Sequence, residues 1–199
     1  MMIKAIIFDF GGVYYHGTFR SAADAVERRF PKKNVMPVIL AHFGPFLSGE
    51  IGRAEFWERV AKGLPPGVAW QDVREAFHAP LRQKGVNSAV EKLTLRLKKR
   101  YKVGLLSNMV EESYREHEAK GHYRHFSYAI HSWKEGIVKP DPRAFHLILK
   151  RMGVQPHEAV FVDDQEKNTR VASELGMHAV LFKNATQLKR ELKRLKVQI

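Results

Sequence analysis

Four short segments of the sequence carry side chains that could act together on one substrate. Asp9 closes a short apolar run, Ser107 and the pair Asp163–Asp164 close two others, and Lys139 stands just past a fourth. Clustered carboxylates repel one another unless a cation neutralises them, and hard oxygen ligands favour Mg²⁺. A cation beside Asp9 would also screen an incoming phosphate from that carboxylate, which could then attack phosphorus. These residue types therefore indicate phosphoryl chemistry, with the hydroxyl, loop amides and lysine holding phosphate oxygens.

Each of these residues also has an ordinary explanation when it is taken alone. Asp163 is a suitable helix cap, and Ser107 and Asn108 are common in turns. What favours a site is that all four segments lie where a strand should end. Open α/β sheets bind their ligands at the carboxyl ends of the strands. We therefore expect the four segments to meet at one edge of a sheet.

Five short apolar runs are the strands that should position these residues. Four of them are almost continuously apolar, which is typical of parallel strands buried on both faces. With helical patterns between them, they predict an α/β fold with a doubly wound, parallel, five-stranded, Rossmann-like sheet. The expected strands are Lys4–Asp9, Val103–Ser107, Tyr128–His131, Ala159–Asp163 and His178–Phe182.

The intervening helices have recognisable ends. Ser88 is placed to cap a helix that leads into the second strand. Asp141–Pro142 is a good start for another helix, which Gly153 should end. A further helix should stop at Gly176.

Residues 17–85 separate the first two strands and are far too long for an ordinary strand–helix loop. They show helical patterns and no convincing strand. We expect a helical cap subdomain over 17–85, above the carboxyl edge, and a core domain made of residues 1–16 and 86–199. Three apolar stripes mark its expected helices: Ala22, Val26 and Phe30; Phe56, Trp57, Val60, Ala61 and Leu64; and Trp70, Val73 and Phe77.

The composition is that of a globular protein with a large excess of basic residues. The 34 lysines and arginines outnumber 21 acidic residues, for a formal net charge of +13. This charge allows a nucleic-acid partner. We favour a solvated basic surface instead, because the basic residues are dispersed over many segments rather than gathered in one patch. The densest runs, Lys98–Lys102 and Lys189–Lys196, lie at the end of one expected helix and along the outer face of another.

Other bulk features bear on the cellular setting. The chain has no cysteine, which excludes disulfides, thiolate metal sites and cysteine nucleophiles. The apolar run Ala5–Phe8 is too short for a signal-peptide core or a membrane span. We expect a soluble cytoplasmic protein with no membrane partner, and the sequence leaves the oligomeric state open.

The chemistry-bearing segments resemble four motifs of the haloacid dehalogenase superfamily, in the order in which that family carries them. The helical segment after the first strand lies where subfamily I carries its type-one cap. The similar segments are Ile6-Ile7-Phe8-Asp9-Phe10-Gly11-Gly12-Val13, Leu105-Leu106-Ser107-Asn108, Gly136-Ile137-Val138-Lys139-Pro140-Asp141-Pro142 and Val162-Asp163-Asp164-Gln165-Glu166-Lys167-Asn168.

The resemblance implies a phosphatase-like hydrolase of a small phosphorylated metabolite, with Mg²⁺ as cofactor. Asp9 would be the nucleophile, and its carboxylate would also bind the metal. The Gly11 backbone carbonyl and Asp164 would be further ligands, with Asp163 nearby through water. Lys139 would share the catalytic role. Phosphate would be held by Ser107, the Asn108 amide and Lys139.

One departure from the family pattern keeps two alternatives open. Phosphatases of this family usually carry a second aspartate two residues after the nucleophile, as the general acid, and this chain has Gly11 there. His16 is better interpreted as a surface residue than as a substitute. A metal-independent 2-haloacid dehalogenase would also lack that acid, but the pair Asp163–Asp164 without a metal makes poor electrostatic sense. The other alternative is a binding or regulatory protein that has lost catalysis.

Overall fold

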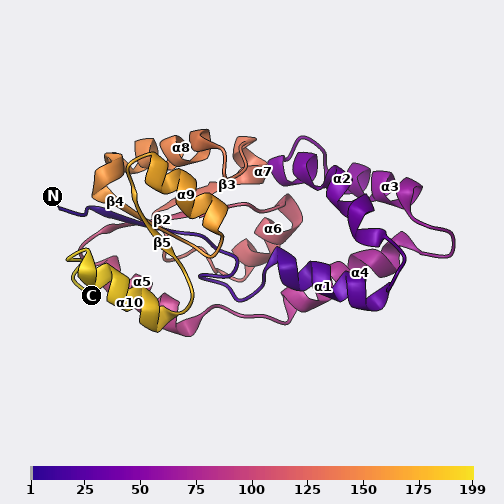
Figure 1. The fold of residues 1–199 in the computed structure, drawn as a ribbon, viewed down its shortest axis with the longest axis horizontal. Helices are drawn as coiled ribbons and strands as arrows, with labels where there is room; N and C mark the ends of the chain where they lie inside the picture. Colours follow the sequence, from indigo (N-terminus) through magenta and orange to yellow (C-terminus); the bar gives the residue numbers. More distant parts are fainter. Residues whose placement is uncertain (1) are drawn as a thin grey trace.

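The computed structural model describes residues 2–199 and contains a five-stranded sheet in which every neighbouring pair is parallel (Figure 1). The strand order is β3-β2-β1-β4-β5, so the first strand lies in the middle. The predicted sheet is confirmed. Its strands are β1 Ala5–Phe8, β2 Lys102–Ser107, β3 Tyr128–His131, β4 Ala159–Asp163 and β5 His178–Leu181.

The expected strand bounds differ from the observed ones by a residue or so. Regular pairing in β1 ends at Phe8 rather than Asp9, and β5 ends at Leu181 rather than Phe182. Hydrogen bonding to β4 nevertheless continues beyond both strand ends. The Asp9 amide donates to the Val162 carbonyl (2.8 Å), and the Phe182 amide donates to the Asp163 carbonyl (2.8 Å). Asp9 is therefore the first residue past a strand that is fully buried.

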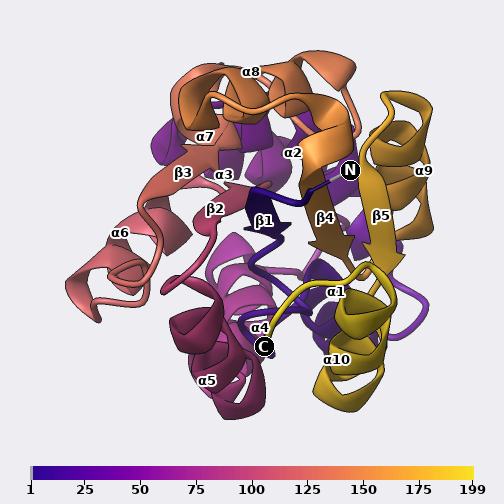
Figure 2. The ribbon, with the colours of Figure 1, turned by 90° about the vertical axis from the view of Figure 1, so that its left-hand side faces the viewer.

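Helices cover both faces of the sheet (Figure 2). The apolar side chains of α5 (Ser88–Leu97) and α10 (Ala185–Arg194) pack with one face. Those of α8 (Pro142–Met152) and α9 (Glu166–Glu174) pack with the other. Shorter helices follow two strand ends: α6 is Glu111–Ala119 and α7 is Ser132–Glu135, and a 3-10 turn spans Pro156–Glu158.

Three of the four expected helix termini, at Asp141, Gly153 and Gly176, are confirmed, and the expected start at Ser88 was wrong. Asp141 caps α8 by accepting from the Arg143 amide (2.9 Å), and Gly153 ends it in a left-handed conformation. Ser88 is not the cap of α5. Asn87 is the cap, because its side-chain Oδ1 accepts from the Val90 amide (3.3 Å), which leaves Ser88 as the first helical residue.

Four helices fill the long segment between β1 and α5, and they surround an apolar cluster of their own. The three expected stripes lie on α1 (Phe19–Arg29), α3 (Arg53–Gly63) and α4 (Trp70–Arg82). The fourth helix, α2 (Val35–Ser48), was not predicted, since its sequence is apolar almost all round and carries Pro45. Figure 1 shows all four at the end of the molecule away from α5 and α10.

Two short connections join these helices to the sheet, and they are hydrogen-bonded to each other. The His16 amide donates to the Gly85 carbonyl (3.1 Å), and the Asn87 amide donates to the Tyr14 carbonyl (2.8 Å). The Tyr15 hydroxyl donates to the Leu81 carbonyl (2.9 Å) at the end of α4. Within residues 2–199, none of the helices has the length and apolar character needed to cross a bilayer.

Candidate active site

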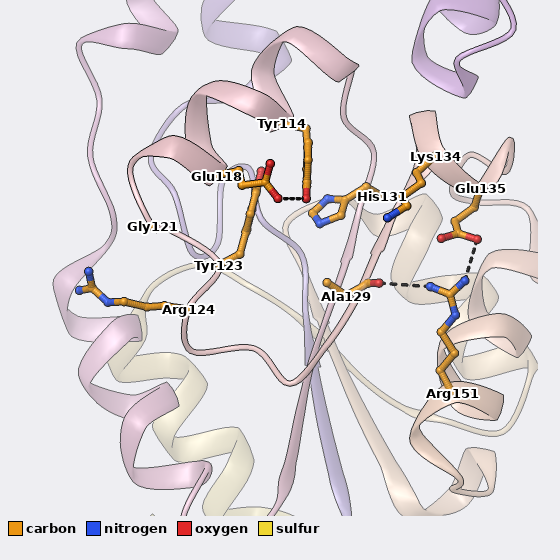
Figure 3. A pocket seen from close by; sticks show the side chains of 10 residues that line it. All are labelled: Tyr114, Glu118, Gly121, Tyr123, Arg124, Ala129, His131, Lys134, Glu135 and Arg151. Carbon is orange, nitrogen blue, oxygen red and sulfur yellow. Dashed lines mark hydrogen bonds and ion pairs between the residues drawn. The ribbon is translucent and has the colours of Figure 1, made fainter.

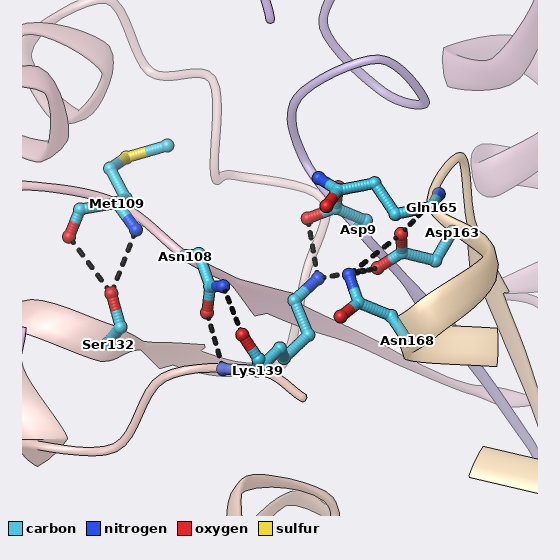
Figure 4. Close-up of polar contacts among 8 residues, drawn as sticks. All are labelled: Asp9, Asn108, Met109, Ser132, Lys139, Asp163, Gln165 and Asn168. Atoms are coloured by element: carbon cyan, nitrogen blue, oxygen red, sulfur yellow. Dashed lines mark hydrogen bonds and ion pairs between the residues drawn. The ribbon is translucent and has the colours of Figure 1, made fainter. Parts of the chain in front are cut away.

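Four of the predicted residues meet at the carboxyl edge of the sheet, around the buried side chain of Lys139 (Figure 4). They are Asp9, Asn108, Lys139 and Asp163. Lys139 Nζ donates to Asp9 Oδ1 (2.8 Å) and to Asp163 Oδ2 (2.7 Å). Asp9 follows β1, Asp163 ends β4, and Lys139 lies on the loop after α7. All three side chains are almost inaccessible to solvent. Residues 130 positions apart in the sequence are thereby joined in one charged group.

Asp163 is fully occupied by donors from its own chain. Besides Lys139, its Oδ1 accepts from the Gln165 amide (2.8 Å), and both of its oxygens accept from Asn168 Nδ2 (3.0 Å each). Its side chain is completely buried. A carboxylate with both oxygens already bonded is suited to orienting Lys139 rather than to direct contact with a ligand.

Asp164 is in the opposite situation. Its Oδ1 is buried and has no hydrogen-bond partner among the described residues. Gly12, with φ of +82°, approaches it so closely that a Cβ there would lie 2.3 Å from Asp164 Oδ2. Only glycine can occupy that position. A buried carboxylate oxygen without a donor is costly unless something else binds it, and an oxygen-seeking cation would do so.

The charges of the cluster do not balance. Asp9, Asp163 and Asp164 offer oxygens that all lie within 4.8 Å of one another. Among residues 2–199, Lys139 is the basic side chain that is ion-paired with them. If all three acids are ionised, two negative charges remain uncompensated. A divalent cation carries the charge that is missing.

The excess of negative charge also shifts the pKa values of the clustered side chains. Burial raises the pKa of Asp9 to about 7; Lys139 opposes the rise, and the charge of Asp163 adds to it. Burial and the charge of Asp163 also raise the pKa of Asp164. Burial lowers the pKa of Lys139, but its two carboxylate partners outweigh burial and raise it overall. Lys139 therefore stays charged, and the raised pKa values of Asp9 and Asp164 show that Lys139 alone does not compensate their negative charge.

Ser107 and Asn108 lie at the end of β2, beside the Lys139 loop. Ser107 is buried as the last residue of that strand. The Asn108 side chain forms two hydrogen bonds with the backbone of Lys139. Its Nδ2 donates to the Lys139 carbonyl (2.8 Å), and its Oδ1 accepts from the Lys139 amide (2.8 Å). The sequence assigned Asn108 only a backbone role, and its side chain has this second one.

Gly11 and His16 are placed differently from each other. The Gly11 carbonyl accepts no hydrogen bond from any described residue, so it is available as a ligand. Its backbone is not in the left-handed region, whereas that of Gly12 is. His16 is exposed on the connection to the helical segment, as expected for a surface histidine.

The neighbouring helical segment contacts this edge directly. Ser132 Oγ donates to the Leu47 carbonyl at the end of α2 (2.7 Å) and accepts from the Met109 amide (2.9 Å). A Cβ at Gly49 would lie 2.2 Å from the Trp133 carbonyl. On the other side, Arg74 of α4 pairs with Glu112 of α6 (2.6 Å). The four helices are therefore held over the loops that follow β2 and β3.

Two supporting residues, and the side-chain role of Asn108, were not identified from the sequence. Asn168 lies one turn into α9, five residues after Asp163, and this spacing could have indicated it. Ser132 directly follows a strand, which is the same signal that identified Ser107. The bonds of Asn108 to Lys139 could not be predicted, because they depend on how two loops 31 residues apart meet.

Apart from the residues around Lys139, a hollow of about 390 Å³ lies beside β3 (Figure 3). His131 is buried there against the rings of Tyr114 (4.7 Å) and Tyr123 (4.8 Å), and burial lowers its pKa to about 4. Arg151 pairs with Glu135 (2.8 Å) in the same hollow. The charged pair of this hollow is compensated, whereas the three carboxylates around Lys139 are not, so the reactive arrangement is the one around Lys139.

Known proteins share both this fold and this sequence pattern. A family model for haloacid dehalogenase-like hydrolases matches residues 3–176. The chain is 26% identical over 208 residues to D-ribitol-5-phosphate phosphatase of Bacteroides thetaiotaomicron, covering 96% of this chain and 97% of that protein. Five other curated relatives are longer proteins, of which the chain spans between 13% and 31%.

Solved structures of two kinds have the same fold. A magnesium complex of a family enzyme from Bacteroides thetaiotaomicron has a TM-score of 0.76 and 23% identity, with 92% of this chain and 94% of that chain covered. A 2-haloacid dehalogenase from Pseudomonas syringae has a TM-score of 0.68 and 19% identity, with 98% and 100% covered. The fold alone therefore does not separate the two activities.

Proposed function

The chain belongs to the haloacid dehalogenase-like hydrolase family, and we propose that within this family it is a Mg²⁺-dependent phosphatase of a small phosphorylated metabolite. The observation that carries the proposal is the unbalanced charge around Lys139, together with the unpartnered Oδ1 of Asp164. The name of the Bacteroides relative supports it, since D-ribitol 5-phosphate is a small phosphate monoester.

The residues present fit a magnesium ion. Asp9, Asp164 and the Gly11 carbonyl would hold it, and Asp163 would stay bonded to Lys139 and Asn168. When bound, the ion would supply the positive charge that the cluster lacks and would screen phosphate from the carboxylates. A relative of the same fold was crystallised with magnesium, which agrees with this assignment.

In the proposed reaction, an Asp9 oxygen attacks phosphorus, the bond from phosphorus to the substrate oxygen breaks, and that oxygen leaves as an alkoxide that takes a proton from water. Water then attacks the aspartyl phosphate, which releases inorganic phosphate and restores the carboxylate. Lys139 holds Asp9 in place and, with the Ser107 hydroxyl and the Asn108 amide, would bind the phosphoryl oxygens. The Asn108 side chain positions Lys139 for this task.

Two observations also bear on a dehalogenase. The chain has Gly11 at the position where phosphatases of this family usually carry the general acid, and a solved dehalogenase shares the fold. Metal-free chemistry would, however, leave Asp9 buried beside two further carboxylates with only Lys139 for compensation. With a pKa near 7, a large fraction of Asp9 would be protonated at neutral pH and unable to attack. The phosphatase fits the site better.

We further propose that residues 17–85 are the type-one cap of subfamily I and that residues 1–16 with 86–199 are the core. The paired connections around Tyr15 and Val86 would be the junction between the two. In that arrangement the cap selects the substrate. The absence of cysteine agrees with a role in the cytoplasm.

The test is hydrolysis of p-nitrophenyl phosphate with Mg²⁺ and with EDTA, for wild type, Asp9→Asn and the exposed control Asp24→Asn. We expect Mg²⁺-dependent turnover that Asp9→Asn reduces more than about a hundredfold. Asp24→Asn should behave like wild type, because Asp24 lies on the exposed side of α1. Full activity in EDTA, or in Asp9→Asn, would exclude the proposed reaction. Mg²⁺ binding without turnover of any phosphate ester would favour a non-catalytic protein.

A further inference from the structure

Most of the net positive charge of the chain comes from two short segments. Residues 88–102 and residues 183–199 each contain six basic residues and one acidic residue, so together they supply ten of the thirteen net charges. The other 167 residues are almost balanced. The basic residues of the two segments are Lys92, Arg96, Lys98, Lys99, Arg100, Lys102, Lys183, Lys189, Arg190, Lys193, Arg194 and Lys196.

The fold brings these two segments together, although about 80 residues separate them in the sequence. The apolar sides of α5 and α10 pack into the same core cluster. The Gln198 amide donates to the Tyr101 hydroxyl (2.9 Å), and Arg100 bonds the Gln198 side chain. Figure 1 and Figure 2 both show the two helices side by side. We call this surface, made of residues 88–102 and 183–199, the basic end.

The charges of the basic end are free to meet a partner. All twelve basic residues are exposed. Among residues 2–199, only Arg190 and Arg194 of the twelve form ion pairs, both with Glu191. Glu91, the other acid of the basic end, pairs with Arg124 outside it. Intramolecular pairing therefore leaves most of this charge uncompensated.

The basic end is also hollowed. A depression of about 770 Å³ lies between the two segments and the start of β1. Its lining contains five basic residues and no acidic one. The lining residues are Met2, Ile3, Lys4, Lys98, Arg100, Tyr101, Lys102, Leu195, Lys196 and Gln198.

This depression is distinct from the candidate active site. Lys4 precedes β1 and Lys102 begins β2, so it lies at the amino ends of the strands. Asp9 and Ser107 lie past the carboxyl ends of the same two strands. A ligand in this depression would therefore not touch the reacting groups.

We propose that the basic end binds nucleic acid through its backbone phosphates, without preference for sequence. Eight of the twelve basic residues are lysines, which bind phosphates as point charges, and contacts to phosphates carry no sequence information. A chain of phosphates follows a concave, positively charged groove, and Tyr101 offers a ring beside it. A membrane fits less well, because the apolar sides of α5 and α10 are buried in the core.

The test is the fluorescence anisotropy of a labelled 20-nucleotide RNA of mixed sequence, and of a DNA strand of the same length, titrated with the full chain. We expect micromolar binding of both strands in 50 mM salt. Affinity should fall about a hundredfold by 200 mM salt if about five phosphates are neutralised. Affinity that is absent at 50 mM salt, or unchanged by salt, would overturn the proposal.

Charge-matched variants separate the basic end from net charge alone. Lys98→Gln/Lys99→Gln/Arg100→Gln and Lys189→Gln/Lys193→Gln/Lys196→Gln should each weaken binding at least tenfold and lower the salt dependence by about two ions. The control removes three exposed basic residues at the other end of the molecule: Arg28→Gln/Lys32→Gln/Lys33→Gln.

The control should change affinity by less than about threefold, and all three variants should keep wild-type turnover of p-nitrophenyl phosphate. Equal losses in the control and in the two basic-end variants would mean that only net charge matters, and would overturn the assignment to this surface. Vesicles containing phosphatidylserine supply the remaining comparison. Binding to these vesicles without binding to either nucleic acid would make the partner a membrane and overturn the proposal.

Discussion

The two edges of the sheet handle charge in opposite ways. At the carboxyl edge, Asp9, Asp163 and Lys139 are buried and Asp164 is half-buried, and each bonded oxygen has a specific donor. At the basic end, which includes the amino edge, twelve basic residues are exposed, and among residues 2–199 only two of them form ion pairs. Buried charges require placed partners, whereas exposed ones are tolerated anywhere and act only together. Reactive chemistry is therefore expected at the first edge, and salt-sensitive association at the second.

The largest expected effect concerns the acid that the carboxyl edge lacks. Without a general acid, p-nitrophenyl phosphate and acetyl phosphate should be hydrolysed about 10²–10⁴-fold faster than simple alkyl phosphates, whose alkoxides must be protonated as they leave. Gly11→Asp should narrow this gap. The backbone at Gly11 permits a side chain, although its Cβ would lie 3.1 Å from the Gly17 carbonyl oxygen.

The measurement is a plot of log kcat/KM against leaving-group pKa for wild type, Gly11→Asp and Gly11→Asn. The asparagine variant has the same shape but no acidic proton, so it should keep the steep wild-type plot. A flat plot for wild type would show that another group supplies the proton. His16 would then be the first residue to replace.

Replacing one lysine by methionine at each edge tests whether buried and exposed charges contribute differently to the free energy of unfolding. Lys139→Met leaves buried carboxylates without their cation and should cost about 3–5 kcal/mol of unfolding free energy at pH 8 in EDTA. Lys99→Met at the exposed edge should change it by less than about 0.5 kcal/mol. Urea unfolding measures both. Similar losses in the two variants would show that Lys139 does not carry the electrostatic role assigned to it.

A change of pH should affect the two edges unequally. Because the pKa of Asp9 is raised to about 7, this carboxyl is mostly ionised at pH 8 and mostly protonated at pH 6. Protons then compete with Mg²⁺, so its affinity should fall about tenfold between pH 8 and pH 6. Lysine and arginine ordinarily titrate far above this range, so RNA affinity should change less than twofold.

Calorimetric titration with Mg²⁺ and RNA anisotropy at the two pH values make this comparison. Mg²⁺ affinity that stayed constant over the interval would contradict the raised pKa of Asp9. RNA affinity that rose strongly at pH 6 would show that histidines contribute to the basic end.

The sequence was informative where chemistry follows strand ends. Asp9, Ser107 and Asp163 could be predicted because a continuous apolar run followed by a polar residue marks a buried parallel strand and its carboxyl end. The helix α2 could not, since a segment that is apolar almost all round shows no periodic stripe. Its burial depends on the neighbouring helices.

Contacts between segments that are distant in the sequence could not be predicted either. Asn108 holds Lys139 across 31 residues, and Ser132 reaches Leu47 across 85. Neither spacing has a local signature. The same limit led the sequence interpretation to treat the two basic runs as separate surfaces, whereas the packing of α5 and α10 on one face of the sheet joins them.

The most direct test of the central claim is calorimetric titration of Mg²⁺ into wild type, Asp164→Ala and the exposed control Asp24→Ala. The unpartnered carboxylate of Asp164 predicts one ion per chain in wild type and in the control. In Asp164→Ala the affinity should be at least tenfold weaker. Wild-type affinity in Asp164→Ala would contradict the ligand assignment and move it to Asp163, and no Mg²⁺ binding by wild type would contradict the metal site itself.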